Sequence, residues 1–311
     1  MKTFLNRIAL LGIMTLGVIL LSFVFNKIIM EKLFRSQSVL PDGVEWLAIG
    51  DSHITNAINP EGYNFLANRA HSGERLYYNM EKLKYYLNDP RNNVNVVILG
   101  LWSNSLNYDK DWLLYAKDAR FRYESYLPLI IYNKSDYSLF YTHENQDLLN
   151  ETLWGSKYGY ISPFVKTTVK NYLTGDFKLK FIGGFLKATN EYDSLILRKA
   201  TEQSFAVKDS IAIENLEEII YLCKSRNISL FLYHTPCTKQ FHELWREEEL
   251  VKFDSIVDIY ADKKSVWYLD FSRKKLPDSY FNDIHHLNKK GADYMTPILV
   301  DTIKTLLNNV E

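Results

Sequence analysis

Residues 44–53 of the chain read VEWLAIGDSH. The apolar run up to Gly50 is nearly continuous, which is typical of a strand buried on both faces of a parallel sheet. Asp51, Ser52 and His53 follow it directly. A serine at this point lies at the carboxyl edge of the sheet, where α/β proteins of this kind bind their ligands. The stretch therefore predicts both a buried strand and a candidate functional serine.

Three further apolar runs suggest additional strands, and they lie at residues 94–101 (VNVVILGL), 228–236 (ISLFLYHTP) and 265–271 (SVWYLDF). Apolar side chains at steps of three and four predict helices around residues 76–87, 216–223 and 295–306. Strands that alternate with helices favour a three-layer α/β/α fold, in which a central parallel sheet is connected by right-handed crossovers.

The first 35 residues differ in composition from the rest of the chain. Residues 8–25 (IALLGIMTLGVILLSFVF) carry no charge and are long enough to cross a hydrocarbon core as a helix. No small-residue cleavage site follows, so residues 1–35 are predicted to be an uncleaved signal anchor, with a cleaved signal peptide as the alternative. Basic side chains flank the run on both sides and give little orientation bias. We expect a cytoplasmic N-terminus and an extracytoplasmic domain over residues 36–311.

The composition excludes several classes of protein. The chain has 311 residues, a formal net charge of zero, 47% apolar and 24% charged residues, which is globular composition. Residues 1–35 hold five basic side chains and one acidic, so the remaining body is mildly acidic and no nucleic-acid partner is expected. Two cysteines exclude a disulfide scaffold. No glycine-rich phosphate loop and no paired metal-ligand spacing occurs, so no cofactor and no metal is expected.

Residues 105–210 interrupt the alternation of strands and helices and hold much of the aromatic content. We interpret them as a large, partly helical insertion between two strands of the sheet. An insertion that follows a strand end is well placed to cover a ligand site. The alternatives are that it only completes the core or forms a dimer contact.

A second polar segment, Asp283-Ile284-His285-His286-Leu287-Asn288, follows the last predicted strand. A serine hydroxyl needs a nearby base before it can attack an acyl carbon. An aspartate three residues before a histidine can lie against that imidazole and fix its tautomer. Ser52, His286 and Asp283 are therefore candidates for a catalytic triad. The alternative is that Asp283 and Asn288 merely cap the helix that begins near residue 289.

Together these segments resemble the SGNH hydrolase superfamily, also called GDSL-type lipases and esterases. Its first block is matched by Ile49-Gly50-Asp51-Ser52, and its last block, D-x-x-H-L-N-x-x-G, is matched in full by Asp283, His286, Leu287, Asn288 and Gly291. The last block selects His286 over His285. The second block, N-x-G-x-x-G, is matched by residues 68–73 with Ala70 in place of the middle glycine. The resemblance covers the body from about residue 44, apart from the insertion, and implies a flavodoxin-like sheet.

The resemblance also implies roles for these residues. Ser52 would be the nucleophile, His286 the general base and Asp283 the group that orients it, while the backbone N–H groups of Ser52 and Gly73 would bind the oxyanion. The third block of the family is usually G-x-N-D, and here the sequence departs from it. Asn104 comes one residue late after Gly100, and no aspartate follows. We expect Asn104 to add its side chain to the oxyanion hole, with Ser103 or Trp102 as alternative occupants of that place.

The predicted function is a membrane-anchored serine esterase or O-acyltransferase. By analogy with anchored members of the superfamily, its substrate would be an O-acyl group, most simply O-acetyl, on a cell-envelope polysaccharide, and an envelope protein that handles acyl groups would be a partner. One alternative is a lipase or lysophospholipase that uses the same triad on a lipid ester. The other is a binding or assembly protein that kept the fold without activity, which the altered third block favours.

Overall fold

The structure is a computed structural model, and it describes residues 1–14, 17, 39–106, 183–188, 210–245, 247–261 and 264–309. The chain divides into two compact units, Met1–Val39 and Leu40–Glu311. The second unit contains the sheet and every sequence-predicted site residue.

A five-stranded parallel sheet with the strand order β2-β1-β3-β4-β5 forms the centre of this unit. Its strands are β1 (Trp46–Ile49), β2 (Leu66–Asn68), β3 (Val96–Gly100), β4 (Ser229–His234) and β5 (Val266–Asp270). Four of them lie inside the apolar runs predicted to be strands. The sequence did not reveal β2, because three residues are too few to show a period. The strand order reverses direction at β1, and ligands of such sheets bind at the carboxyl ends beside that reversal.

One face of the sheet is covered by α2 (Ser52–Ala57) and α12 (Lys289–Asn308), which pack against each other. Alternate strand residues, among them Trp46, Ile98 and Phe231, meet apolar side chains of both helices there. The predicted helix near the end of the chain is confirmed, since α12 contains the Met295, Leu299 and Ile303 stripe.

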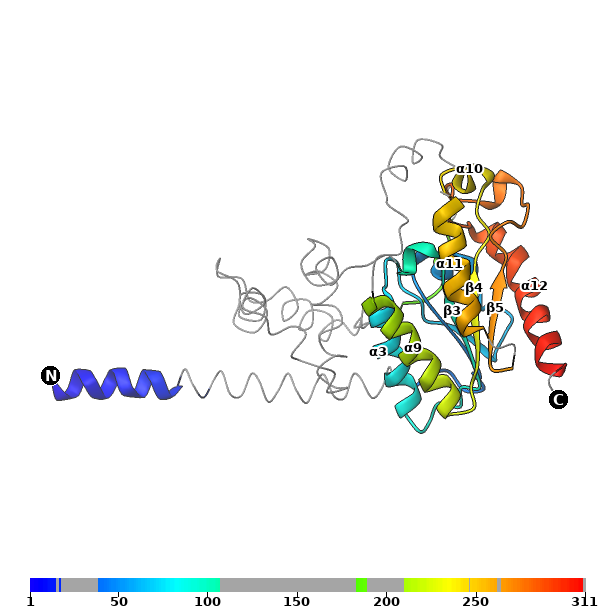
Figure 1. Cartoon of the computed structure of the whole chain (residues 1–311). Helices are drawn as coiled ribbons and strands as arrows, with labels where there is room; N and C mark the ends of the chain where they lie inside the picture. Colours follow the sequence, from blue (N-terminus) through cyan, green and yellow to red (C-terminus); the bar gives the residue numbers. More distant parts are fainter. Residues whose placement is uncertain are drawn as a thin grey trace. The chain divides into compact units, whose positions relative to one another are not determined.

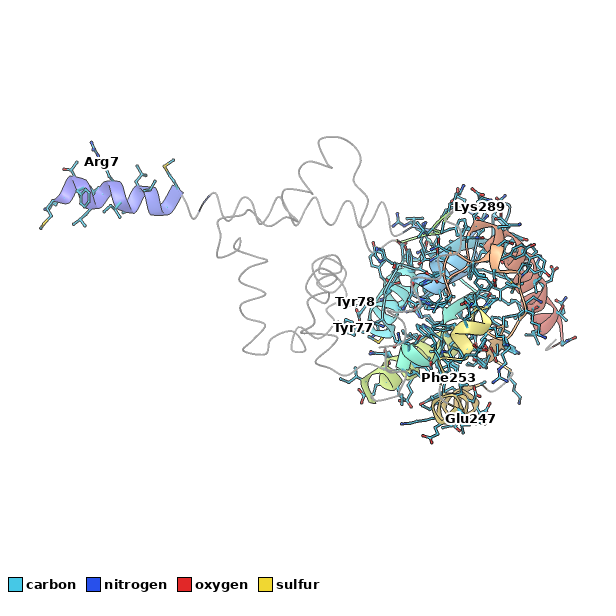
Figure 2. All side chains as sticks on the ribbon, turned by 90° about the horizontal axis from the view of Figure 1, so that it is seen from above. Arg7, Tyr77, Tyr78, Glu247, Phe253 and Lys289 are labelled. Atoms are coloured by element: carbon cyan, nitrogen blue, oxygen red, sulfur yellow. The ribbon has the colours of Figure 1, made fainter. Side chains whose placement is uncertain are left out.

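The other face lies beneath α3 (Leu76–Asn88), α9 (Ser210–Ser225) and α11 (Glu247–Tyr260), while α12 lies on the opposite side of the strands (Figure 1). The α3 and α9 helices contact each other. In α11 the side chain of Phe253 is buried, whereas Glu247 is exposed (Figure 2). The described residues thus form an α/β fold in which helices flank both faces of the sheet.

Three short helices lie at the carboxyl edge or beside it, and these are η1 (Ser103–Leu106), α10 (Lys239–His242) and η5 (Asp278–Tyr280). The first follows β3, the second follows β4, and the third precedes the segment with Asp283.

Residues 183–188, which belong to the predicted insertion, form hydrogen bonds with the sheet unit. The N–H of Gly184 donates to the carbonyl of Ala70, and the N–H of Leu186 donates to that of Thr55, each at 2.8 Å. The N–H of Lys289 donates to the carbonyl of Ala188, also at 2.8 Å. The segment therefore contacts the loop after β2, helix α2 and the start of α12. The rest of the predicted insertion lies outside the described residues, except for residues 105, 106 and 210.

Residues 2–14 of the first unit are helical. Within the parts of the chain that the structure describes, no helix combines the length and the apolarity needed to span a membrane. The predicted anchor over residues 8–25 lies largely outside the described residues, which include only residues 8–14 and 17 of it, all helical.

Candidate active site

Two glycines allow the helix that carries Ser52 to lie close to the strand ends. A Cβ on Gly50, whose φ is +149°, would approach Cγ1 of Ile54 to 2.6 Å and Cα of Gly100 to 3.2 Å. A Cβ on Gly100 would also meet Ile54. The first turn of α2 therefore packs over the ends of β1 and β3 only because neither position has a side chain. This packing fixes where Ser52 lies.

Ser52, His286 and Asp283 form a continuous hydrogen-bonded array. Oγ of Ser52 lies 2.7 Å from Nε2 of His286, and Nδ1 of His286 lies 2.7 Å from Oδ2 of Asp283. An ionised carboxylate only accepts hydrogen bonds, so Nδ1 carries the hydrogen and Nε2 has the lone pair that accepts from the hydroxyl. This is the geometry of a nucleophile, a base and a group that orients the base.

The other oxygen of Asp283 binds the loop itself. Oδ1 accepts from the backbone N–H groups of His285 at 2.9 Å and His286 at 2.8 Å. Burial opposes ionisation of Asp283, but the hydrogen bond and charge of His286, followed by the ring and the backbone N–H of His285, outweigh burial and hold the carboxyl pKa below its usual range. Asp283 is therefore an anion that holds both the ring and the backbone of His286.

The capping alternative applies to Asn288 and not to Asp283. Asn288 is the N-cap of α12, and its Oδ1 accepts from the N–H of Gly291 at 3.0 Å. Its side-chain amide donates to the carbonyls of Ser279 and Phe281, each at 3.0 Å. These bonds set the start of α12 and the loop before it, which carries His286.

The loop over residues 68–74 contains Gly73, the predicted second oxyanion donor. Asn68 accepts from the N–H of Ala70 at 3.0 Å and donates to the carbonyls of Ile54 in α2 and of Ile58 at its C-cap, so it holds the loop against the helix that begins at Ser52. Beyond Gly73, which has a φ of +68°, Glu74 pairs with Lys82 at 2.5 Å, and both side chains are fully buried. That Gly73 and the Ser52 N–H bind an oxyanion stays a prediction.

Trp102 lies at the end of β3, in the block that departs from the family pattern. Its indole Nε1 donates to Oδ2 of Asp51 at 2.9 Å, and its ring packs 4.4 Å from that of His53. Asn104 lies in η1 and is half-buried, and within the described part of the chain its side chain makes no hydrogen bond. The expected contribution of Asn104 to an oxyanion hole therefore stays a prediction.

A second Asp–His pair lies beside the array. Asp51 caps α2 and accepts at Oδ1 from the N–H of His53 at 2.9 Å and from its Nδ1 at 3.1 Å. Burial opposes ionisation of Asp51, but His53 and then Trp102 lower its pKa below the usual range. Nε2 of His53 in turn lies 3.0 Å from Nδ1 of His285. Sequence reasoning did not assign His53 or His285, although both adjoin a predicted triad residue in the sequence.

Burial and then the neighbouring rings of His286 and His53 lower the pKa of His285 well below its ordinary value, so that ring is neutral near pH 7. It stacks on Phe241 with ring centroids 4.9 Å apart. His234 ends β4, and its Nδ1 lies 3.1 Å from the Tyr268 hydroxyl. Its side chain is buried.

A small hollow opens beside the strand ends. Its lining is mostly polar and consists of Asp51, Glu74, Arg75, Leu76, Asn79, Gly100 and Ser105. It adjoins the first turn of α2 through Asp51 and the end of β3 through Gly100. Ser52 itself is not among the residues that line it.

The fold and the array define an α/β protein with a serine, a histidine and an aspartate in nucleophile–base–orienter geometry at the carboxyl edge of a parallel sheet. One protein-family profile matches residues 184–308, which is less than half of the chain. No curated protein sequence matches the chain.

Solved structures to which the chain is similar include those of three bacterial proteins. One, from Bacteroides fragilis, is described as an acylhydrolase, with 10% identity and a TM-score of 0.42 over 89% of this chain and 96% of its own. Another, from Streptococcus pneumonia, is described as a platelet activating factor, with 14% identity and a TM-score of 0.42 over 93% and 98%. A GDSL-like lipase from Bacteroides thetaiotaomicron has 9% identity and a TM-score of 0.40 over 89% and 97%. At these identities and TM-scores the similarity shows neither a family nor a reaction for this chain.

Proposed function

We propose that the protein is an SGNH-type serine esterase or O-acyltransferase. The observation that carries this proposal is the pair of 2.7 Å contacts that join Ser52 to His286 and His286 to Asp283. A free serine hydroxyl is almost never ionised near neutral pH, and a base in direct contact removes that barrier. The match to the first and last sequence blocks of the superfamily supports the same assignment.

In the first half of the reaction, Oγ of Ser52 attacks the acyl carbon of the ester while Nε2 of His286 takes the hydroxyl proton. Asp283 stabilises the resulting imidazolium through Nδ1. The oxyanion accepts hydrogen bonds from the N–H groups of Ser52 and Gly73, with Asn104 as a third donor. The tetrahedral intermediate collapses, the alkoxide leaves with the proton from His286, and the acyl group stays on Ser52.

In the second half, His286 removes a proton from an incoming hydroxyl, which attacks the acyl-serine. If that hydroxyl belongs to water, the products are a carboxylic acid and the free enzyme, which is esterase activity. If it belongs to a sugar, the acyl group is transferred. The same residues perform both reactions, so the acceptor alone separates an esterase from a transferase.

The proposed substrate is an O-acetyl or similar short O-acyl group on a cell-envelope polysaccharide. Analogy with anchored members of the superfamily supports this substrate. We also propose that residues 8–25 anchor the chain in a membrane with the catalytic unit on the extracytoplasmic side, since 18 uncharged residues suffice to span it. An envelope protein that supplies acyl groups would then be a partner.

The test is covalent labelling of the full chain with a fluorophosphonate, followed by intact-mass analysis. We expect one adduct on the wild type and none on Ser52→Ala. Ser255→Ala, which removes an exposed hydroxyl on α11, is the matched control and should label normally. A folded wild type that takes no adduct would overturn the serine-esterase assignment and favour a non-catalytic binding protein.

A second measurement separates the substrates. Hydrolysis of acetylated glycans and short acetyl esters is compared with hydrolysis of long-chain and lysophospholipid esters. We expect activity on the short esters. A clear preference for long acyl chains would replace the polysaccharide assignment with the lipase alternative.

A further inference from the structure

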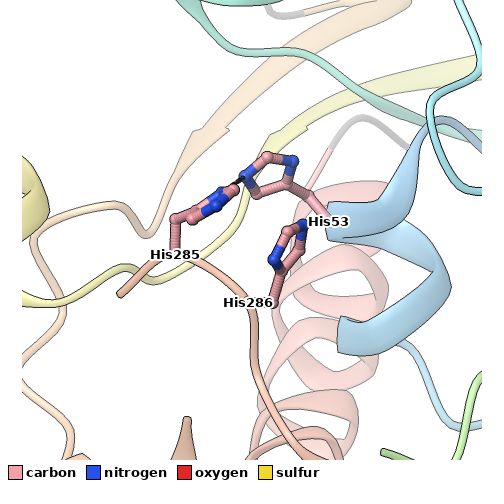
Figure 3. Close-up of side chains that lie close together, drawn as sticks. All are labelled: His53, His285 and His286. Carbon is pink, nitrogen blue, oxygen red and sulfur yellow. Dashed lines mark hydrogen bonds between the residues drawn. The ribbon is translucent and has the colours of Figure 1, made fainter. Parts of the chain in front are cut away.

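Three imidazoles lie close together, and one of them, that of His286, contacts the hydroxyl of Ser52. His53 comes from the first turn of α2, and His285 and His286 come from the loop before α12 (Figure 3). One ligand nitrogen from each ring lies within 4.8 Å of the other two. Among the described residues this is the one such group of histidine, cysteine and carboxylate side chains.

Two of these rings have a carboxylate behind them. Nδ1 of His53 faces Oδ1 of Asp51 at 3.1 Å, and Nδ1 of His286 faces Oδ2 of Asp283 at 2.7 Å. A histidine that binds a metal through one nitrogen almost always donates the hydrogen on its other nitrogen to such a partner, which fixes its tautomer. Each carboxylate therefore leaves a lone pair on Nε2 of its histidine, which is the form that binds a metal.

The third ring, that of His285, needs only a change of tautomer to bind a metal. Because Nε2 of His53 has no hydrogen in this arrangement, Nδ1 of His285 is the donor in their 3.0 Å contact. A metal between these two nitrogens would displace that hydrogen. The hydrogen then sits on Nε2 of His285, which lies 3.8 Å from Oδ1 of Asp283. No net proton is lost from the ring, and its new N–H faces a carboxylate.

We propose that His53, His285 and His286 bind one divalent transition-metal ion, of which Zn²⁺ is the best fit, and that this ion switches the proposed hydrolase off. Neutral imidazoles are the ligands that Zn²⁺ commonly takes, at about 2.0–2.1 Å. Three histidines leave the fourth tetrahedral position for water. The sequence predicted no metal, because the ligands come from segments 232 positions apart.

The regulatory half of this inference rests on the proposed function. His286 has its Nδ1 committed to Asp283, so Nε2 is its one free lone pair. That lone pair accepts the hydroxyl of Ser52 at 2.7 Å. A metal bound at Nε2 would remove the base from Ser52 and leave the hydroxyl un-ionised. Metal removal would restore the array without any change in the fold.

The binding half is tested without any substrate. The full chain is stripped with EDTA and titrated with Zn²⁺ in competition with a chromophoric chelator. We expect one equivalent to bind, and we expect His53→Gln and His285→Gln each to weaken binding at least tenfold. Asp51→Asn should weaken it about 10–100-fold through His53. His71→Gln, which alters a histidine outside the cluster, should bind like the wild type.

Circular dichroism of each variant shows whether it folds, and His285→Gln is the more conservative change because that ring is 20% exposed. Wild type that binds no Zn²⁺, or that binds it equally well after both cluster substitutions, overturns the inference. Either result would leave the proposed esterase activity untouched.

The regulatory half is tested by the rate of fluorophosphonate labelling. We expect one equivalent of Zn²⁺ to slow labelling of the wild type at least tenfold and EDTA to restore it. Unchanged or faster labelling by the zinc-loaded protein overturns inhibition. If the metal-free wild type is never labelled, the proposed function is wrong, and the chelator titration alone then tests the metal site.

Discussion

The indole of Trp102 donates from Nε1 to Oδ2 of Asp51 across 2.9 Å, so the end of β3 is joined to the cap of α2. Both residues are largely buried, and the indole also packs against His53. The side chain of Trp102 therefore faces the residue before Ser52, and its bond to Asp51 supports the position of α2.

Replacement of Trp102 by Phe should destabilise the protein by about 1.5–3 kcal/mol at pH 7, since it removes a donor to a charged, buried acceptor. Asp51 has a lowered pKa in the folded state, so its contribution is present above the unfolded value of about 3.9 and is lost as the pH falls through the folded pKa. The difference between variant and wild type should shrink below about pH 4. Urea unfolding at pH 7 and pH 3 measures it.

Trp245→Phe is the matched control for Trp102→Phe. Its indole nitrogen is buried and makes no hydrogen bond within the described residues, so its loss should cost less. Equal losses in the two variants at pH 7 would mean that ring volume, and not the bond to Asp51, accounts for the effect.

The buried pair of Glu74 and Lys82 ties together the two ends of the loop that carries Gly73. Lys82 contacts Glu74 at 2.5 Å and donates to the carbonyl of Arg69 at 2.6 Å. Lys82→Met should cost about 3–5 kcal/mol in unfolding free energy, because it leaves a buried carboxylate without its partner. The double variant with Glu74→Leu should recover much of that loss and yet label more slowly with the fluorophosphonate, because the loop is no longer held.

Chemical denaturation and labelling rates of the single and double variants test this. Lys289→Met, which breaks an exposed pair with Asp293, is the control and should cost at most about 1 kcal/mol. A double variant that labels as fast as the wild type would show that the ion pair does not position the loop.

Four of the five strands and the helices α3, α9 and α12 could be predicted from apolar periodicity, because burial on one or both faces leaves a regular pattern. The short β2 has too few residues to show one. The last sequence block led to His286 over His285, and the structure brings His286 to Ser52 at 2.7 Å. Local sequence order is enough there, since Asp283 and His286 lie on one loop.

The contacts of Trp102, His53 and His285 could not be predicted in the same way. Each joins segments distant in the sequence, and their partners depend on how closely α2 lies on the strand ends. Helix α2 can lie this close because Gly50 and Gly100 have no side chain. The sequence does not show which side chains lie next to these two glycines. A glycine at the end of a strand is otherwise explained equally well by a turn.

Gly100→Ala should therefore displace α2. The new methyl group would overlap the side chain of Ile54, and overpacking of this kind costs about 1–3 kcal/mol. A shift of Ser52 away from His286 should also slow fluorophosphonate labelling. Ile54→Ala in the same chain makes room for the methyl group, so the double variant should label faster than Gly100→Ala alone. Independent, additive effects of the two substitutions would contradict the overlap.

His234 should make the stability of the protein depend on pH between about 6.5 and 3. Burial lowers the pKa of His234 to about 3, and the neighbouring Asp270 opposes this only in part. The folded ring stays neutral while the unfolded ring, with a pKa of about 6.5, takes up a proton as the pH falls. The unfolded state therefore binds more protons in this range, and the free energy of unfolding falls with the pH by up to about 1.4 kcal/mol per unit for this group.

Urea unfolding of wild type and His234→Gln at pH 6 and pH 4 measures the effect, and the wild type should lose about 2–3 kcal/mol more than the variant. His71→Gln, which changes a ring in contact with solvent, should follow the wild type. Parallel pH profiles for wild type and His234→Gln would mean that His234 is protonated in the folded protein, with Asp270 as its counter-ion.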